Sequence, residues 1–302
     1  MKIAHQNLVW QNLANPDFND LAFLKDDLKV SNQVLAELVS SNKRPKIEEY
    51  ENYMFLVIHF PVFNERTRQT TPTELDFIIT PNSILTVYQS PIPVFEDFFN
   101  GMQNTEIRRQ ECFKSSGWLL FCILDKLFDS CLPMLDHIHE KIEEIEEQVF
   151  QGKEREMLKE IAIVKRDIID FRRTVKPQRS VLELLTKKSA RFLKEHLDII
   201  AQEVIGSEIR VWNILENHKE MIEAIETTNA GLLSYQINRV MHTLTFFSII
   251  IFSLTFIAAF FGMKIFENHP LTQNSQGIWI IGGIMLTAIL VITLFFKKKK
   301  LM

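Results

Sequence analysis

Two long apolar runs lie near the C-terminus, at residues 244–261 and 278–296, and a short polar segment separates them. They contain 18 and 19 residues and no charged side chain. At about 1.5 Å per residue, a helix of either length just crosses a hydrocarbon layer of about 30 Å. Neither run is at the N-terminus, where a signal peptide would lie. The pattern predicts a transmembrane hairpin that follows a large water-exposed body.

The N-terminal third has the pattern of a small mixed domain. Residues 54–59, 75–80 and 83–88 are rich in β-branched and aromatic side chains, and prolines bound them, as is typical of short strands. Pro81-Asn82 is expected to form a hairpin turn. Residues 18–40 and 116–132 are expected to form helices that cover the sheet.

Helical periodicity begins at residue 135. Ile138, Ile142, Ile145 and Val149 are spaced by four, three and four, and a second apolar stripe runs from residue 158 to 175 beyond Gly152. Two such stripes on either side of a glycine predict an antiparallel helical hairpin. A third helix is expected from about residue 180 to 261, with an interruption near residue 190, so that the soluble body continues into the first span.

These patterns predict an α+β cytoplasmic domain over residues 1–134. A helical hairpin and stalk helix follow over residues 135–243, and a transmembrane hairpin with a basic tail occupies residues 244–302. A stalk helix that continues into the membrane would transmit movements of the soluble domain as a rigid lever.

The distribution of charged residues predicts the orientation of the chain in the membrane and the classes of partner that it can bind. Four lysines at 297–300 follow the second span. The positive-inside rule therefore predicts a multi-pass inner-membrane protein with both termini in the cytoplasm. The part before the first span has 29 basic and 37 acidic residues, a net charge of −8, which argues against nucleic acid as a partner. The three cysteines lack metal-ligand spacing and are interpreted as reduced, apolar side chains.

The first apolar run carries a stripe of mostly polar or small residues, and this stripe suggests a pathway. Residues spaced alternately by three and four lie along one side of a helix. Such a stripe is either a close helix-packing seam or the wall of a water-filled path. A path requires an oligomer, in which Met241, Leu244 and Phe252 would form apolar constrictions. The stripe comprises Asn238, Met241, Thr245, Ser248, Phe252, Thr255, Ala259 and Gly262.

Several segments resemble the CorA family of magnesium transporters. They are Tyr235-Gln-Ile-Asn-Arg-Val-Met-His-Thr-Leu-Thr, Leu254-Thr-Phe-Ile-Ala, Phe261-Gly-Met, Arg44-Pro-Lys-Ile-Glu-Glu and Val175-Lys-Pro-Gln-Arg-Ser-Val-Leu. The resemblance implies a homopentamer with a funnel-shaped cytoplasmic domain and a pore lined by the first span. It also implies entry of hydrated Mg²⁺, with Co²⁺ or Ni²⁺ as competitors, and no resident cofactor.

The resemblance also implies roles for single residues. Asn238 matches a polar pore ring, Met241 and Leu244 match a hydrophobic gate, and Thr255 matches a pore threonine. Gly262 and Met263 match the first two residues of an outer Gly-Met-Asn tripeptide.

The third position of that tripeptide departs from the family, because Lys264 replaces asparagine. Asparagine accepts hydrogen bonds from the water shell of Mg²⁺, whereas lysine only donates them. Five ammonium groups about 10 Å from the ion would repel it by about 4 kcal/mol in water, and salt screening reduces this to about 1 kcal/mol. Glu267, three residues on, can neutralise the lysine if the helix persists. The alternatives are a tolerated surface lysine, altered selectivity or gating, and loss of transport.

Regulatory carboxylates are a further implication of the resemblance. Glu195 and Asp198 loosely match a stalk segment that binds Mg²⁺ between subunits, and the alternative is that both are solvated helix carboxylates. His137 and His139 point apart at positions i and i+2 of a helix, so no metal site is expected there.

The chain lacks the phosphate-loop, nucleophile-elbow and HExxH motifs, so an enzyme is not expected. Alternatives to a Mg²⁺ transporter are a carrier of another cation such as Zn²⁺, resembling the ZntB branch, and a non-conducting membrane protein of the same fold.

Overall fold

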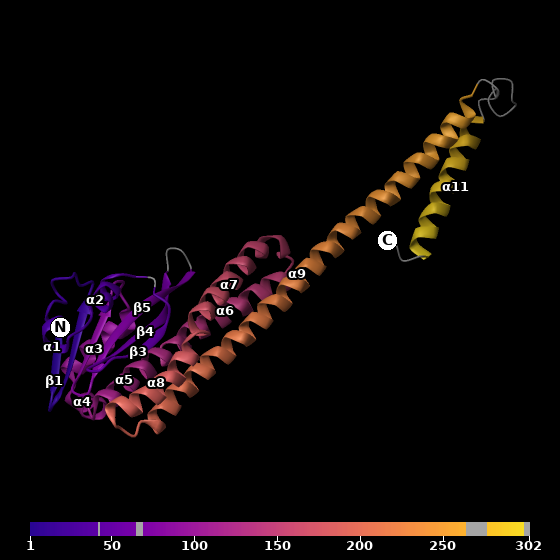
Figure 1. The fold of residues 1–302 in the computed structure, drawn as a ribbon. Coiled ribbons are helices and arrows are strands. Elements are labelled where there is room, and N and C mark those ends of the chain that lie inside the picture. Colours follow the sequence, from indigo (N-terminus) through magenta and orange to yellow (C-terminus); the bar gives the residue numbers. More distant parts are fainter. Residues whose placement is uncertain (42, 65–68, 264–276, 299–302) are drawn as a thin grey trace. The chain divides into compact units, whose positions relative to one another are not determined.

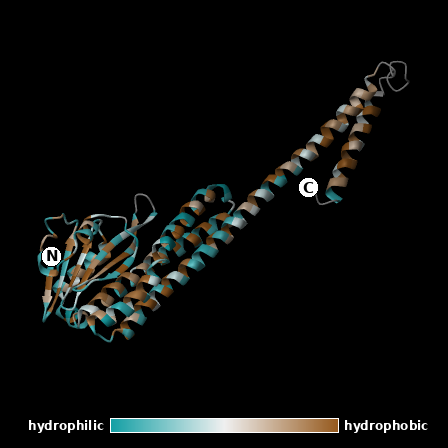
Figure 2. Ribbon diagram, viewed as in Figure 1, coloured by the Kyte–Doolittle hydropathy of each residue, from teal (hydrophilic) through white to brown (hydrophobic). Residues whose placement is uncertain are grey.

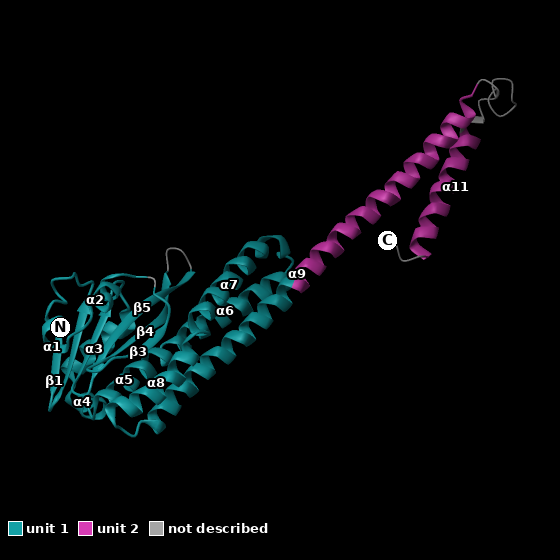
Figure 3. Cartoon of the chain, viewed as in Figure 1, with its two compact units in different colours: residues 1–226 teal, residues 227–302 magenta. Residues whose placement is uncertain are grey.

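The computed structural model describes residues 1–41, 43–64, 69–263 and 277–298 (Figure 1). The chain has two compact units, Met1–Glu226 and Thr227–Met302, which are described separately (Figure 3). The division into residues 1–134, 135–243 and 244–302 stays a prediction.

A six-stranded sheet forms the centre of the first unit. The strands follow the order β1-β2-β6-β5-β4-β3, in which β2 and β6 are parallel and the other neighbours are antiparallel. The three predicted strand segments lie within β4, β5 and β6, and Thr80 pairs with Ser83 around the predicted Pro81-Asn82 turn. The strands are β1 Lys2–His5, β2 Leu8–Ala14, β3 Lys46–Glu49, β4 Met54–Asn64, β5 Gln69–Thr80 and β6 Ser83–Tyr88.

Two prolines that were expected to bound strands lie inside them. Pro61 of β4 and Pro72 of β5 are paired directly opposite each other. β3 pairs with β4 only as far as Val57, and β6 pairs with β5 only from Asp76 onward. Neither proline therefore has to supply an N–H to a second neighbouring strand, which is the condition under which a sheet tolerates proline.

Helices cover both faces of the sheet. Met54 and Leu56 of β4 pack into a core that includes Phe95, Leu120 and Leu182. This face is covered by α3 (Pro93–Asn104), α5 (Ser116–Asp129) and α8 (Gln178–Leu193). Phe55 and Val57 point to the opposite face and pack under α1 and α2. The helices up to α5 are α1 Phe23–Leu28, α2 Asn32–Val39, α3 Pro93–Asn104, α4 Glu106–Cys112 and α5 Ser116–Asp129.

The predicted helical hairpin is present as α6, Cys131–Phe150, and α7, Glu154–Val175. Gly152 has φ +88°, a conformation that glycine adopts without strain. The third helical segment consists of α8, Gln178–Leu193, and α9, Asp198–Phe261. The interruption expected near residue 190 lies at residues 194–197 and begins with Lys194 in a left-handed conformation, φ 57°.

The second unit is a helical hairpin. It contains the C-terminal part of α9 and α11, Gly277–Lys298, which runs back along α9 (Figure 1). Both segments are long and apolar enough to cross a membrane, and both are mostly brown in Figure 2. Phe246 and Phe296 contact each other edge to face, with ring centroids 5.3 Å apart. The two predicted apolar runs therefore form a helical hairpin.

Candidate functional site

The polar stripe of α9 is largely uncovered in the second unit. Asn238, Thr245, Thr255 and Ala259 are exposed, and Ser248 is half-buried. The larger apolar residues of the stripe are also exposed, Met241 to 55% and Phe252 to 74%. Leu244 is 58% exposed and lies on one flank of the stripe.

The second helix of the hairpin packs on the opposite side of α9. Phe246 is 7% exposed, and Ile250, Ile257 and Phe261 are half-buried along the same side of the helix. At about 100° per residue, this side lies roughly 170° around α9 from the stripe. The stripe is therefore not the packing seam between the two helices of this hairpin. If the stripe is a helix-packing seam, it must therefore pack on another molecule.

Hydroxyl groups on the stripe are anchored to their own helix. Thr245 Oγ1 donates to the carbonyl oxygen of Met241 at 2.8 Å, Ser248 Oγ donates to Leu244 at 2.9 Å, and Thr255 Oγ1 donates to Ile251 at 2.8 Å. A hydroxyl has one donor and two acceptor positions, so each oxygen keeps acceptor capacity on the exposed side. The stripe can thus accept hydrogen bonds from the water shell of a cation.

Gly262 and Met263 lie directly after the last residue of α9. The Gly262 N–H donates to the Ala258 carbonyl oxygen at 3.0 Å, and a Cβ at this position would lie 3.2 Å from the same oxygen. A larger residue would press on the last helical turn. Lys264 and Glu267, which complete the predicted selectivity loop, lie outside the described residues.

Glu195 has a partner within the chain. Ser115 Oγ donates to Glu195 Oε2 at 2.5 Å and accepts from the Trp118 N–H at 3.1 Å, so the same serine caps α5 and holds the α8–α9 connection. Asp198 is exposed in the first turn of α9. Within the described ranges, no three His, Cys, Asp or Glu side chains are arranged to hold a metal ion. A regulatory metal at Glu195 and Asp198 stays a prediction about contacts between subunits.

The histidines of α6 have separate surroundings. His137 contacts the ring of Phe63, whereas His139 stacks on His218 of α9, with centroids 5.5 Å apart. Burial and the neighbouring His139 lower the pKa of His218. Sequence spacing could not reveal this pair, because its members lie 79 positions apart.

A sequence model of the CorA-like Mg²⁺ transporter proteins matches residues 5–298. The chain belongs to this family. The cobalt/magnesium transport protein CorA of Thermotoga maritima is 26% identical over 88% of this chain and 75% of its own length. A zinc transport protein ZntB of Pectobacterium atrosepticum is 20% identical over 85% of this chain and 76% of its own. The structure of the CorA magnesium transporter from Methanocaldococcus jannaschii superposes with a TM-score of 0.85, at 22% identity, over 98% of this chain and 92% of that one.

Membership in the CorA family makes the chain a membrane transporter for divalent cations, and the members of this family are not enzymes. The α/β domain, the long stalk helix and the C-terminal helix all match the CorA fold. The two candidate transmembrane helices are those that the apolar runs predicted. The family resemblance inferred from the sequence is confirmed.

Proposed function

We propose that this chain forms a homopentameric, channel-like transporter that admits Mg²⁺ to the cytoplasm through the inner membrane. In this arrangement five copies of α9 surround one axis, and α11 faces outward. Both termini lie in the cytoplasm, where the first unit gates the pore through the stalk helix. The membrane potential drives entry, because moving two charges through 100 mV releases about 4.6 kcal/mol.

The observation that carries this proposal is the position of the stripe relative to α11. Polar and small side chains occupy the side of α9 that its own hairpin leaves open. Polar groups that faced lipid would find no hydrogen-bond partners there, whereas around a shared axis they would line a water-filled path. Rings of Asn238 and Thr255 would accept hydrogen bonds from hydrated ions, and Met241 and Leu244 would narrow the path as an apolar gate.

The chemistry of the stripe favours Mg²⁺ over Zn²⁺. Its polar groups are one amide and three hydroxyls, and hydrated Mg²⁺ is a hard ion that is handled through oxygen. Zn²⁺ prefers imidazole and thiolate ligands, and the stripe contains neither histidine nor cysteine. The relationship to the ZntB proteins is also the more distant one. Co²⁺ and Ni²⁺ are the expected competitors.

A pair of hydroxyl substitutions tests the role of the stripe. Thr255→Val removes one hydroxyl from each subunit on the stripe, while Ser253→Ala removes one from the side of α9 that is half-buried toward α11. Both hydroxyls donate to their own helix at 2.8 Å, so the local helical change is matched. The loss of a net hydrogen bond of about 0.5–1.5 kcal/mol should slow Mg²⁺ uptake by Thr255→Val proteoliposomes about two- to tenfold. Ser253→Ala should transport normally.

Equal uptake by both variants would contradict a pathway along the stripe. An absence of flux in the unmodified protein would favour the non-conducting alternative. Uptake of Zn²⁺ without Mg²⁺ would favour the zinc alternative.

A further inference from the structure

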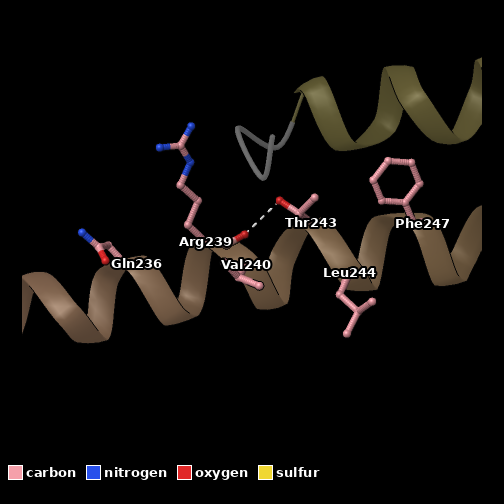
Figure 4. A pocket seen from close by; sticks show the side chains of 6 residues that line it. All are labelled: Gln236, Arg239, Val240, Thr243, Leu244 and Phe247. Atoms are coloured by element: carbon pink, nitrogen blue, oxygen red, sulfur yellow. Dashed lines mark hydrogen bonds between the residues drawn. The ribbon is translucent and has the colours of Figure 1, made fainter. Parts of the chain in front are cut away.

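An open groove of about 580 Å³ follows α9 where its apolar segment begins (Figure 4). Arg239 lies toward its N-terminal end and Phe247 toward its C-terminal end, about 12 Å apart along the helix axis at 1.5 Å per residue. The lining changes along this direction from polar to apolar, as an upright phospholipid does. The lining residues are Gln236, Arg239, Val240, Thr243, Leu244 and Phe247.

The groove does not coincide with the stripe of the proposed pore. Its centre lies roughly 130° around α9 from the stripe, on the half of the helix that also contacts α11. Only Leu244, at the edge, is common to the groove and the proposed gate. In the proposed pentamer this half of α9 faces outward, where lipid is the surrounding solvent.

Positive charge collects at the polar end of the groove without a balancing carboxylate. Glu267 is the single acidic residue between positions 227 and 302, and it follows the far end of α9. No carboxylate of the described residues forms an ion pair with Arg239. The contact between Phe246 and Phe296 brings the exposed Lys297 and Lys298 back to the same end of the hairpin. The charge therefore complements an anion.

We propose that this groove binds an anionic phospholipid of the cytoplasmic leaflet. The guanidinium of Arg239 would hold the headgroup phosphate through two parallel hydrogen bonds, and Lys297 and Lys298 would add attraction. One acyl chain would lie along Val240, Leu244 and Phe247. The orientation rests on the proposed function, which places this end of the hairpin at the cytoplasmic surface.

The test measures lipid retention on the full-length protein by native mass spectrometry. Protein equilibrated with equal amounts of phosphatidylglycerol and phosphatidylcholine should retain phosphatidylglycerol preferentially. Arg239→Gln should weaken that preference roughly fivefold, the effect of one cationic residue at a membrane surface. Arg239→Lys should restore part of it. The matched control is Arg210→Gln, an exposed arginine of α9 in the first unit, which should retain lipid normally.

Equal retention by Arg239→Gln and the unmodified protein would overturn the proposal, as would an equal loss in Arg210→Gln. Displacement of the lipid by millimolar inorganic phosphate would overturn it in favour of a free-phosphate site. Lipid retention does not require conduction, so a protein that binds phosphatidylglycerol but carries no cation would contradict only the proposed function.

Discussion

At the scale of single residues, a buried charge cluster in the first unit is sensitive to pH. Lys43 Nζ lies 2.5 Å from Glu74 Oε1 and 2.8 Å from Asp76 Oδ2. Burial opposes ionisation of Glu74, but the His59 imidazole 3.6 Å away and the ammonium and backbone N–H groups of Lys43 outweigh it and lower the pKa of Glu74. Burial raises the pKa of Asp76 to about 8, because the single ammonium group cannot offset desolvation and the charge of Glu74. Asp76 is therefore the carboxyl that holds a proton at neutral pH.

Protonation of Asp76 makes the stability of the folded state depend on pH. The pKa of Asp76 rises from 3.8 to about 8 on folding, so its proton stabilises the folded state fully below pH 3.8, and this contribution is lost as the pH rises toward 8. Denaturant unfolding should show lower stability at pH 8 than at pH 6, by up to about 1.4 kcal/mol per pH unit. Asp76→Asn cannot ionise and should flatten this dependence. The same slope in both proteins would show that Asp76 does not titrate in this range.

Lys264 is the residue at which the chain departs from the family tripeptide. If its ammonium group faces the ion, Lys264→Asn removes a screened repulsion of about 1 kcal/mol and adds an acceptor for hydration water. The Mg²⁺ concentration that half-saturates uptake should then fall about fivefold. Lys264→Gln is the control that also removes the charge. Unchanged flux and selectivity in both variants would show that the lysine is a tolerated surface residue.

At the scale of elements, periodic or β-rich segments could be predicted and irregular ones could not. The hairpin of α6 and α7 follows from its apolar spacing, and β4, β5 and β6 follow from their composition. β2 was missed because its buried positions include the polar Asn12, whose side-chain oxygen accepts a hydrogen bond from Thr86 Oγ1 at 2.9 Å. The break before α9 has neither glycine nor proline, so the sequence indicates its place only approximately.

The connection between α8 and α9 packs tightly against Gly117 of α5. A Cβ added at Gly117 of α5 would lie 2.5 Å from Leu197 Cδ1 and 2.6 Å from Glu195 Oε2, whereas a Cβ at Gly206 of α9 would meet nothing within 4 Å. Gly117→Ala should destabilise the protein by about 1–3 kcal/mol through overpacking. Gly206→Ala should stabilise it by about 0.5–1 kcal/mol through helix propensity. Thermal unfolding in detergent measures both, and stabilisation by Gly117→Ala would contradict the tight contact at the start of α9.

At the scale of the whole molecule, the sequence predicts the transport pathway only in part. The three-four spacing from Asn238 to Ala259 identifies a stripe, but spacing cannot say whether the stripe packs on a second helix. That distinction depends on which side of α9 receives α11, and the contact of Phe246 with Phe296 decides it. The groove at Arg239 could not be predicted from spacing for the same reason. The lysines that complete its positive charge lie almost sixty positions further along the chain. The pentamer requires contacts between chains and stays a proposal.

Voltage-driven ion uptake by the purified protein shows directly whether α9 lines a cation pathway. Proteoliposomes that contain an ion-sensitive dye would be given an inside-negative potential, after the protein is shown to be pentameric by mass. A pore along α9 predicts Mg²⁺ uptake that increases with the potential and competes with Co²⁺ and Ni²⁺. An absence of Mg²⁺, Co²⁺, Ni²⁺ and Zn²⁺ flux at every potential, in a pentameric protein, would contradict it.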